Sequence, residues 1–259
     1  MSAPGPRDAV IVAAVRTPVG KGRPARPGKP GGALHGWHSV DLLARTFEAT
    51  LERVGLDPAE LPPDLLDDVL VGCVGQASEQ AVNVARNAAL AAGLPEAVPA
   101  ATIDRQCGSS QQALQFASQA IRAGDADLVL VGGVESMSRV PMFSAAKGAD
   151  PYGPRLAARY PGGLVPQGIS AELIAARWGL SRAELDAFAA ESHRRAASAA
   201  DAGLLSDQLV ALAVDRGDGP TGETLTRDEG VRPGTTTETL AGLEPVFGYL
   251  HRNHEKIGE

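Results

Sequence analysis

Short apolar runs alternate with amphipathic stretches through the first half of the chain, and this alternation constrains the fold more than any other feature. Continuous runs rich in Val and Ile are typical of strands buried on both faces, and apolar residues three and four positions apart are typical of helices. The pattern therefore predicts an α/β fold, a mostly parallel sheet with helices on both faces. Strands are expected over residues 8–20, 67–76, 100–106 and 126–138, and helices over residues 39–56, 83–94 and 109–125.

The character of the sequence changes after Ser138. Pro, Gly and Tyr dominate until helical patterns return over residues 169–180 and 181–204, the second opening on a Ser-x-x-Glu capping box. One short helix is expected within residues 228–247, and no series of strands is recognised. These residues predict an excursion packed against the sheet domain, too long for an ordinary loop and suited to building a ligand site.

Composition excludes several classes of protein. A net charge of -7 and a pI near 5.3 argue against a nucleic-acid binder, which would show a basic face. The two cysteines cannot form a disulfide framework, and no Cys/His spacing typical of a metal site is present. No run approaches the ~20 apolar residues of a membrane span, and the first residues lack a signal-peptide core. A cytoplasmic protein without metal is expected.

Cys107 lies in the segment IDRQCGSSQQAL, where an expected strand ends and an expected helix begins. A helix N-terminus carries unpaired N–H groups and partial positive charge, which favour the nucleophilic thiolate. Gly108 would let a substrate approach the backbone, and Ser109 and Ser110 could cap the helix. The arrangement suits covalent acyl transfer. The alternative is that Cys107 is a small buried apolar residue, which is the only interpretation offered for Cys73.

A base that would activate the thiol is not evident. No motif pairs any of the five histidines with Cys107, and each is expected to be structural or solvated: His35, His38, His193, His251 and His254. A cysteine nucleophile without a base is an incomplete catalyst. A Cys–His hydrolase would need one of these rings within hydrogen-bond reach of the sulfur.

Several motifs, in order, resemble the thiolase family. They are RTPVG, IDRQCGSSQQAL, GGVESMSRVPM, QGISAELIAARWGLSRAELDAFAAESHRRA and DEGVRPGTTTETLAGLEPVF, and together they run from about Ala9 to Phe247. The resemblance implies a thiolase-like N-terminal sheet domain over residues 1–138 and a CoA-binding loop domain over residues 139–247. Residues 248–259 match nothing in the family and read as a frayed tail.

The resemblance also implies a reaction. Cys107 would take an acyl group from a 3-oxoacyl-CoA, releasing acetyl-CoA or propionyl-CoA, and free CoA would collect the acyl group from the sulfur. The cysteine motif looks closest to degradative thiolases acting on fatty-acid or steroid side chains. CoA and acyl-CoA would be substrates, with no covalently bound cofactor, and the family implies a homo-oligomer. Arg232 matches an Arg beside the CoA nucleotide, where a cation suits the phosphates.

Two departures from the family pattern concern the site. Pro166, Gln167 and Gly168 stand where short-chain thiolases often have His-Met-Gly lining the acyl pocket, so Gln167 is expected to contact substrate in a different pocket. Asp104 replaces the commoner Asn beside the cysteine motif, with no predicted consequence.

The family's Asn-Glu, His-Pro-x-Gly and Cys-x-Gly motifs do not occur in this sequence. They would carry the activating His and the second catalytic Cys, so the expectation is an N-terminal portion that is inactive alone. The alternative is a non-catalytic acyl-CoA-binding or partner-binding module.

Overall fold

A computed structural model describes residues 7–247 and divides them into two compact units. The sheet unit comprises residues 7–147 and 206–230, and the helical unit comprises residues 148–205 and 231–247. The units do not follow chain order, because residues 206–230 return to the first unit. The expected assignment of 1–138 and 139–247 to two family domains stays a prediction, and the tail 248–259 lies outside the described residues.

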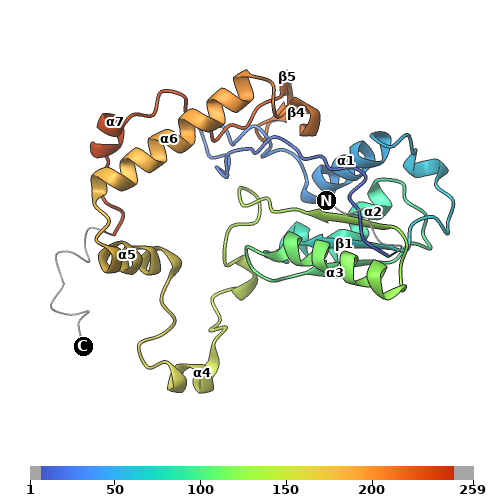
Figure 1. Cartoon of the computed structure of the whole chain (residues 1–259), viewed down its shortest axis with the longest axis horizontal. Helices are drawn as coiled ribbons and strands as arrows, with labels where there is room; N and C mark the ends of the chain where they lie inside the picture. The colour runs from blue at the N-terminus through green and yellow to red at the C-terminus, as the bar shows by residue number, and fades with distance from the viewer. Residues whose placement is uncertain (1–6, 248–259) are drawn as a thin grey trace. The chain divides into compact units, whose positions relative to one another are not determined.

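A three-stranded parallel sheet lies at the centre of the sheet unit (Figure 1). The strand order is β2-β1-β3, with β1 (Asp68–Gly72) between β2 (Ala100–Ile103) and β3 (Val129–Gly133). Each strand is shorter than the apolar run that predicted it, since the run continues into the loop at the strand end. The predicted parallel pairing is confirmed.

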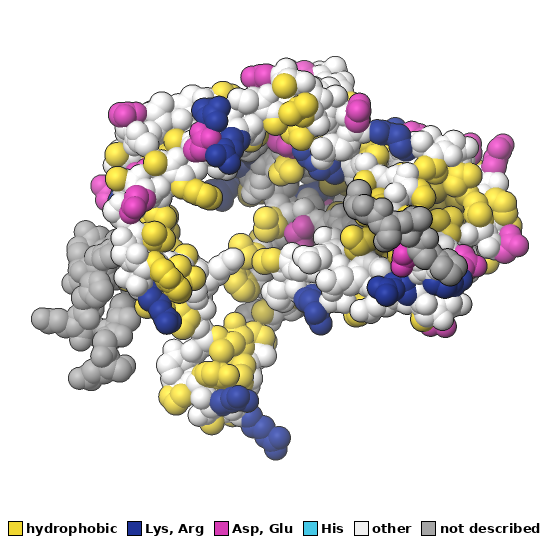
Figure 2. Space-filling model, viewed as in Figure 1, with side chains coloured by type: hydrophobic (Ala, Val, Ile, Leu, Met, Phe, Trp, Pro, Cys, Tyr) yellow, Lys and Arg dark blue, Asp and Glu magenta, His cyan; other side chains and the backbone are white. Residues whose placement is uncertain are grey.

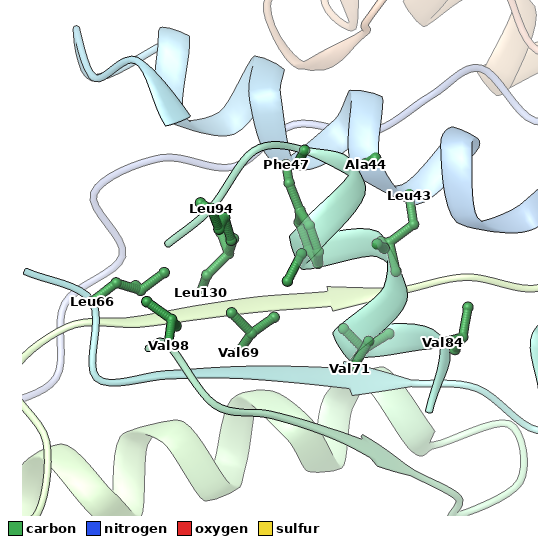
Figure 3. Close-up of a cluster of buried hydrophobic side chains, with 14 of the residues drawn as sticks. Leu43, Ala44, Phe47, Leu66, Val69, Val71, Val84, Leu94, Val98 and Leu130 are labelled. Atoms are coloured by element: carbon green, nitrogen blue, oxygen red, sulfur yellow. The ribbon is translucent and has the colours of Figure 1, made fainter. Parts of the chain in front are cut away.

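Helices cover both faces of the sheet, as predicted. α1 (Ser39–Glu52) and α2 (Val84–Ala91) lie together on one face, and α3 (Ser109–Ala123) lies on the other (Figure 3). His38 caps α1 by accepting a hydrogen bond from Val40 N, and Asn83 caps α2. α3 ends at Gly124 in the left-handed conformation that glycine adopts without strain.

The hydrophobic core fills the space between the sheet and the pair α1 and α2. Phe47 of α1 reaches down toward the sheet, where Val69 of β1 and Leu130 of β3 point up to meet it (Figure 3). Phe47 and Val69 are at most 1% exposed. Alanines of α2 let that helix pack closely against α1. The sheet unit therefore carries a core of its own.

The predicted strand over residues 8–20 is wrong. The segment contains no strand, and its one ladder contact is an isolated bridge between Arg16 and Leu209. Val10, Ile11 and Val12 are each more than 60% exposed. A buried strand needs a continuous ladder of backbone hydrogen bonds as well as an apolar sequence. The backbone of this segment is instead bonded at separate points: Arg16 to Gln208 and Val210, and Val19 to Asp228 and Glu229.

Two strands after Ser138 were not predicted, since the sequence analysis recognised no series of strands there. β4 (Leu212–Asp215) and β5 (Pro220–Leu225) form an antiparallel hairpin that belongs to the sheet unit. The following residues are bound to the N-terminal segment through carboxylates. Arg16 makes two hydrogen bonds of 2.7 and 3.0 Å to Asp228, and Glu229 accepts from the backbone N–H groups of Lys21 and Ala33.

The helical unit consists of four helices (Figure 1): α4 (Gly153–Arg159), α5 (Gln167–Trp178), α6 (Arg182–Asp201) and α7 (Thr237–Ala241). The helices over 169–180 and 181–204 and the short one after residue 228 were predicted, whereas α4 was not. The predicted capping box of α6 is confirmed, with Ser181 and Glu184 bonded to each other's backbone N–H groups.

Short 3-10 helices complete the described elements: η1 (Pro58–Glu60), η2 (Ser78–Gln80), η3 (Ser144–Ala146) and η4 (Ser206–Gln208). Among residues 7–247, no helix has the length and apolar character required to span a bilayer.

Candidate active site

The turn from β2 into α3 carries Cys107. Gly108 N donates to Arg105 O at 3.1 Å, and Ser109 N donates to Gln106 O at 3.0 Å. Gln106 adopts a left-handed conformation with φ of 48°, and its N–H bonds the Asp104 carboxylate at 2.7 Å. Such backbone strain persists only where surrounding bonds fix it, as they do here. The turn therefore holds Cys107 in one place.

The side chain of Cys107 is exposed at this turn. The alternative of a buried apolar residue is therefore wrong for Cys107. Capping by serine is wrong as well, since the N-cap is Gly108, without a side-chain bond. Ser109 is instead buried, where its Oγ accepts from Arg105 N at 2.9 Å and donates to Gln106 O. Ser109 braces the turn that presents the thiol.

Two glycines that the sequence argument overlooked let α3 reach the sheet. A Cβ on Gly72, at the end of β1, would lie 2.2 Å from Ser110 N, and one on Gly133, at the end of β3, would lie 2.8 Å from Ser110 Cβ. Any side chain at Gly72 would displace the backbone of the first turn of α3. A glycine closing each of two neighbouring strands was the signal that could have revealed this approach.

Gly108 differs from these packing glycines. Its φ of -94° is open to any residue, and a Cβ there would meet only Arg105 atoms at 3.5 Å or more. The packing of this chain does not require glycine at position 108. The expectation that Gly108 leaves room for a substrate stays a prediction.

A buried polar network, also overlooked, joins the loops that follow β1 and β3. Gln80 is fully buried and uses both ends of its amide. Its Nε2 donates to Gly75 O at 2.8 Å and to Glu135 at 2.9 Å, and its Oε1 accepts from Ser136 N at 2.8 Å and from Ser39. Glu135 in turn accepts from the N–H of Val74. The network fixes the edge of the sheet at which β2 delivers Cys107.

Cys73 contrasts with Cys107. It is 1% exposed in the core, as predicted. Burial raises the pKa of the Cys73 thiol to about 12, and the carboxylates of Glu135 and Asp104 add to the shift. Cys73 therefore stays a neutral thiol at physiological pH.

A catalytic base for Cys107 would be hydrogen-bonded to its sulfur, and none of the described histidines is. His38 bonds Val40 N through Nδ1 and lies 3.8 Å from the Glu79 carboxylate, and His193 accepts from Arg232 N. Nδ1 of His35 is buried without a hydrogen-bond partner. His251 and His254 lie outside the described residues. Within the described part of the chain, the sulfur of Cys107 has no hydrogen-bond partner.

The expected CoA-binding residues lie in the helical unit. Gln167 is the first residue of α5, after the N-cap Pro166. The neighbouring Gly168 is packed by Phe247, whose ring would lie 2.2 Å from a Cβ there. Arg232 is exposed in the loop before α7. No group of His, Cys, Asp and Glu suited to holding a metal ion occurs among residues 7–247.

Comparison with known families gives a match over nearly the whole chain. Residues 9–249 match the model of the thiolase N-terminal domain. The chain belongs to the thiolase family. The resemblance carried by the cysteine motif and the later helices is thereby confirmed, as is the expected fold of a thiolase N-terminal sheet domain with helices on both faces.

Curated relatives agree with this thiolase assignment. The chain is 40% identical over 247 residues to a steroid 3-ketoacyl-CoA thiolase of Mycobacterium tuberculosis. It is 43% identical over 239 residues to a 3-ketoacyl-CoA thiolase of Erwinia tasmaniensis and 42% identical over 238 residues to one of Escherichia coli. Each alignment covers 92% of this chain and 56–57% of the relative, so the chain spans a little over half the length of these thiolases.

Proposed function

We propose that the chain serves an acyl-CoA C-acyltransferase, a thiolase that cleaves 3-oxoacyl-CoA through an acyl-cysteine intermediate on Cys107. The observation that carries the proposal is an exposed thiol held on a hydrogen-bonded turn at the carboxyl edge of a parallel sheet. Relatives named 3-ketoacyl-CoA thiolases support the reaction class. The proposed substrates are fatty-acyl or steroid side-chain 3-oxoacyl-CoA thioesters that are being degraded, and one of these relatives is named a steroid 3-ketoacyl-CoA thiolase.

The proposed chemistry has two steps. The thiolate of Cys107 attacks the 3-oxo carbon, and the bond between carbons 2 and 3 breaks, leaving the acyl group on sulfur. The electron pair passes to carbon 2 of the departing thioester, which takes up a proton as acetyl-CoA or propionyl-CoA. The thiolate of a second CoA then attacks the carbonyl carbon of the acyl group on Cys107. The bond from that carbon to the cysteine sulfur breaks, which releases the shortened acyl-CoA and restores the cysteine thiolate.

Arg232 and Gln167 are the proposed contacts for CoA and its acyl chain. The Arg232 guanidinium suits a phosphate of CoA, since charge-assisted bonds to phosphate are among the strongest available to a side chain. The proposal includes a cytoplasmic homo-oligomer that uses acyl-CoA and CoA as substrates without a covalently bound cofactor.

Turnover by the polypeptide alone is proposed to be absent or slow. Within the described residues, no base is bonded to Cys107, and general acid–base help contributes about 10²–10⁴-fold to a rate. The same observation favours a second candidate function, a non-catalytic module that binds acyl-CoA or a partner.

The test is transfer of an acetyl group from acetyl-CoA to the chain, followed by intact mass and peptide mapping. We expect one acetyl group on the peptide that contains Cys107 and none on the peptide that contains Cys73, whose raised pKa and burial leave it neutral and inaccessible. The variant Cys107→Ser should show no acetylation.

Each result separates the candidates. Acetylation of Cys107 supports the acyl-enzyme. Saturable CoA binding without acetylation supports the non-catalytic module. Absence of both binding and acetylation contradicts the acyl-enzyme and the acyl-CoA-binding module. Equal acetylation of the two cysteines contradicts the assignment of Cys107 as the nucleophile.

A further inference from the structure

The loop that carries Arg232 is joined to α6 by one hydrogen bond from the backbone to a side chain. Arg232 N donates to Nδ1 of His193 at 3.2 Å, across 39 residues of sequence. The Arg232 carbonyl accepts from Thr235 N at 3.1 Å, which closes a turn directly before α7. The peptide units on both sides of Arg232 are therefore occupied, one by the imidazole and one by the turn.

The guanidinium of Arg232 is free by contrast. The residue is exposed, and within residues 7–247 its side chain has no hydrogen-bond or ion-pair partner. Three arginines of α6 are instead paired with carboxylates: Arg182 with Asp186, and Arg194 and Arg195 with Glu191. A fixed backbone beneath an unpaired guanidinium is the arrangement expected of a cation held ready for an anionic ligand.

The segment that contains this loop and α7 is fixed to α6 at two points. Arg182, the first residue of α6, donates to the carbonyls of Leu240 and Leu243 at 2.6 and 3.1 Å, which ties the end of α7 to α6. Thr236 and Thr239 form a capping box at the start of α7. α6 and α7 pack together along this region. His193 is thus the attachment point to α6 on the Arg232 side of α7.

We propose that His193 is a positioning residue for CoA binding: its Nδ1 holds the Arg232 backbone so that the guanidinium is presented to a phosphate of CoA. The inference rests on the proposed function, which places Arg232 at the CoA nucleotide. Because Nδ1 accepts, the neutral ring carries its proton on Nε2. An acceptor at the δ position of residue 193 is therefore the property that matters.

Substitution of His193 by asparagine or by glutamine distinguishes the hydrogen-bond acceptor role of His193 from a packing role. Asparagine places its amide oxygen near the position of Nδ1, so His193→Asn keeps the acceptor. Glutamine extends its amide to the position of Nε2, so His193→Gln loses it. His193→Leu removes the acceptor entirely, and Ser192→Ala, at an exposed position on the same helix, is the control.

The experiment is calorimetric titration of the full chain with CoA and with pantetheine, which lacks the nucleotide and its phosphates. We expect His193→Leu and His193→Gln to weaken CoA binding by about five- to tenfold, the effect of one lost hydrogen bond. His193→Asn and Ser192→Ala should bind CoA as the wild type does. Pantetheine binding should be equal in all variants.

Nuclear magnetic resonance provides a readout independent of CoA. The ring nitrogens of His193 should show the Nε2–H tautomer. The Arg232 amide should be protected from exchange in the wild type, Ser192→Ala and His193→Asn, but not in His193→Leu or His193→Gln. Dispersed spectra of each variant show that it is folded, so a loss of affinity cannot be assigned to unfolding.

The outcomes separate the two proposals. If the wild type binds CoA and Arg232→Ala does not, but His193→Leu binds as the wild type, the role of His193 is overturned and the CoA site stands. If His193→Asn fails as His193→Leu does, or pantetheine binding falls equally, the role is also overturned. If the wild type does not bind CoA, or Arg232→Ala binds it unchanged, the proposed CoA site fails and the role of His193 fails with it.

Discussion

The sheet unit and the helical unit are stabilised by different interactions. In the sheet unit, side chains from α1, α2, β1 and β3 form a continuous buried cluster, and the partly buried Ala100 of β2 packs against it. In the helical unit, α4, α5 and α7 have no buried residue, and α6 has only Ala197. Large apolar side chains remain on its surface, as Figure 2 shows over the helices labelled α4 and α5 in Figure 1.

The helical unit is stabilised by polar interactions, because few of its side chains are buried. Two of its helices begin with complete capping boxes, and Arg182 ties α6 to the end of α7. Each such interaction contributes on the order of 1 kcal/mol, whereas burying one large side chain contributes about 1.5–3 kcal/mol. Cys107 therefore lies on a unit that its own hydrophobic core stabilises, whereas the position of Arg232 depends on individual hydrogen bonds.

The largest expected effect comes from a matched pair of phenylalanines. Phe47 is 1% exposed in the sheet unit and Phe188 is 79% exposed on α6. Phe47→Ala should lower the free energy of unfolding by about 3–5 kcal/mol through lost burial and a cavity. Phe188→Ala should change it by about 0.5 kcal/mol or less. Urea titrations followed by circular dichroism measure both.

Equal losses of unfolding free energy in the two variants would contradict the difference between the two units. They would mean that Phe188 is covered in solution and that the helical unit has a hydrophobic core under those conditions. A loss confined to Phe47→Ala would confirm that burial stabilises only the sheet unit.

A smaller effect is expected from the buried network at the sheet edge. Gln80→Leu keeps the side-chain size but leaves the buried Ser136 N without its acceptor. It also removes one donor each from Gly75 O and Glu135, which keep their bonds to the N–H groups of Ala77 and Val74. A buried polar group left unpaired costs about 1–3 kcal/mol, so Gln80→Leu should destabilise the protein by at least that amount. The same urea titration measures it.

Gln119→Leu is the control, since Gln119 is exposed on α3. It should change stability by about 0.5 kcal/mol or less. A Gln80→Leu protein as stable as the wild type would show that water or rearranged loops replace the network. The sheet edge would then be less fixed than its hydrogen bonds indicate.

Much of the sheet unit could be predicted from periodicity, because its strands and helices are local patterns with clear end signals. The segment around Val10–Val12 shows the limit. Its sequence fits a buried strand, but pairing depends on which other segment lies beside it, and sequence periodicity does not encode that. β4 and β5 were missed because they are short and pair across a turn of Asp and Gly, and their return to the sheet unit is a non-local event.

For the candidate site too, local sequence signals were predictable and non-local contacts were not. Cys107 could be found because a thiol between a strand and a helix is a local signal. Gln80 and Glu135 could not, because their importance comes from burial and from partners 55 residues apart. His193 was expected to be structural or solvated, but its bond to Arg232 N is visible only once α6 and the loop before α7 are folded together.

The smallest expected effect tests the polar interactions of the helical unit. Ser181→Ala removes the side-chain cap of α6 and should lower the protection of α6 amides from hydrogen exchange by about 1 kcal/mol. Ser192→Ala, in the middle of the same helix, should leave it unchanged. Amides of α1 should keep their protection, because the core of the sheet unit is untouched.

The cap also makes the stability of α6 depend on pH. The backbone N–H of Ser181, then its hydroxyl, lower the pKa of Glu184 below its usual value. A carboxyl group with a lowered pKa in the folded state stabilises above its unfolded pKa, and this contribution is lost as the pH falls through the folded value. In the wild type, α6 should therefore lose protection in acid, and Ser181→Ala should show a smaller loss. Equal loss in α1 and α6 would mean that the two units unfold as one, in contradiction to the division of interactions between them.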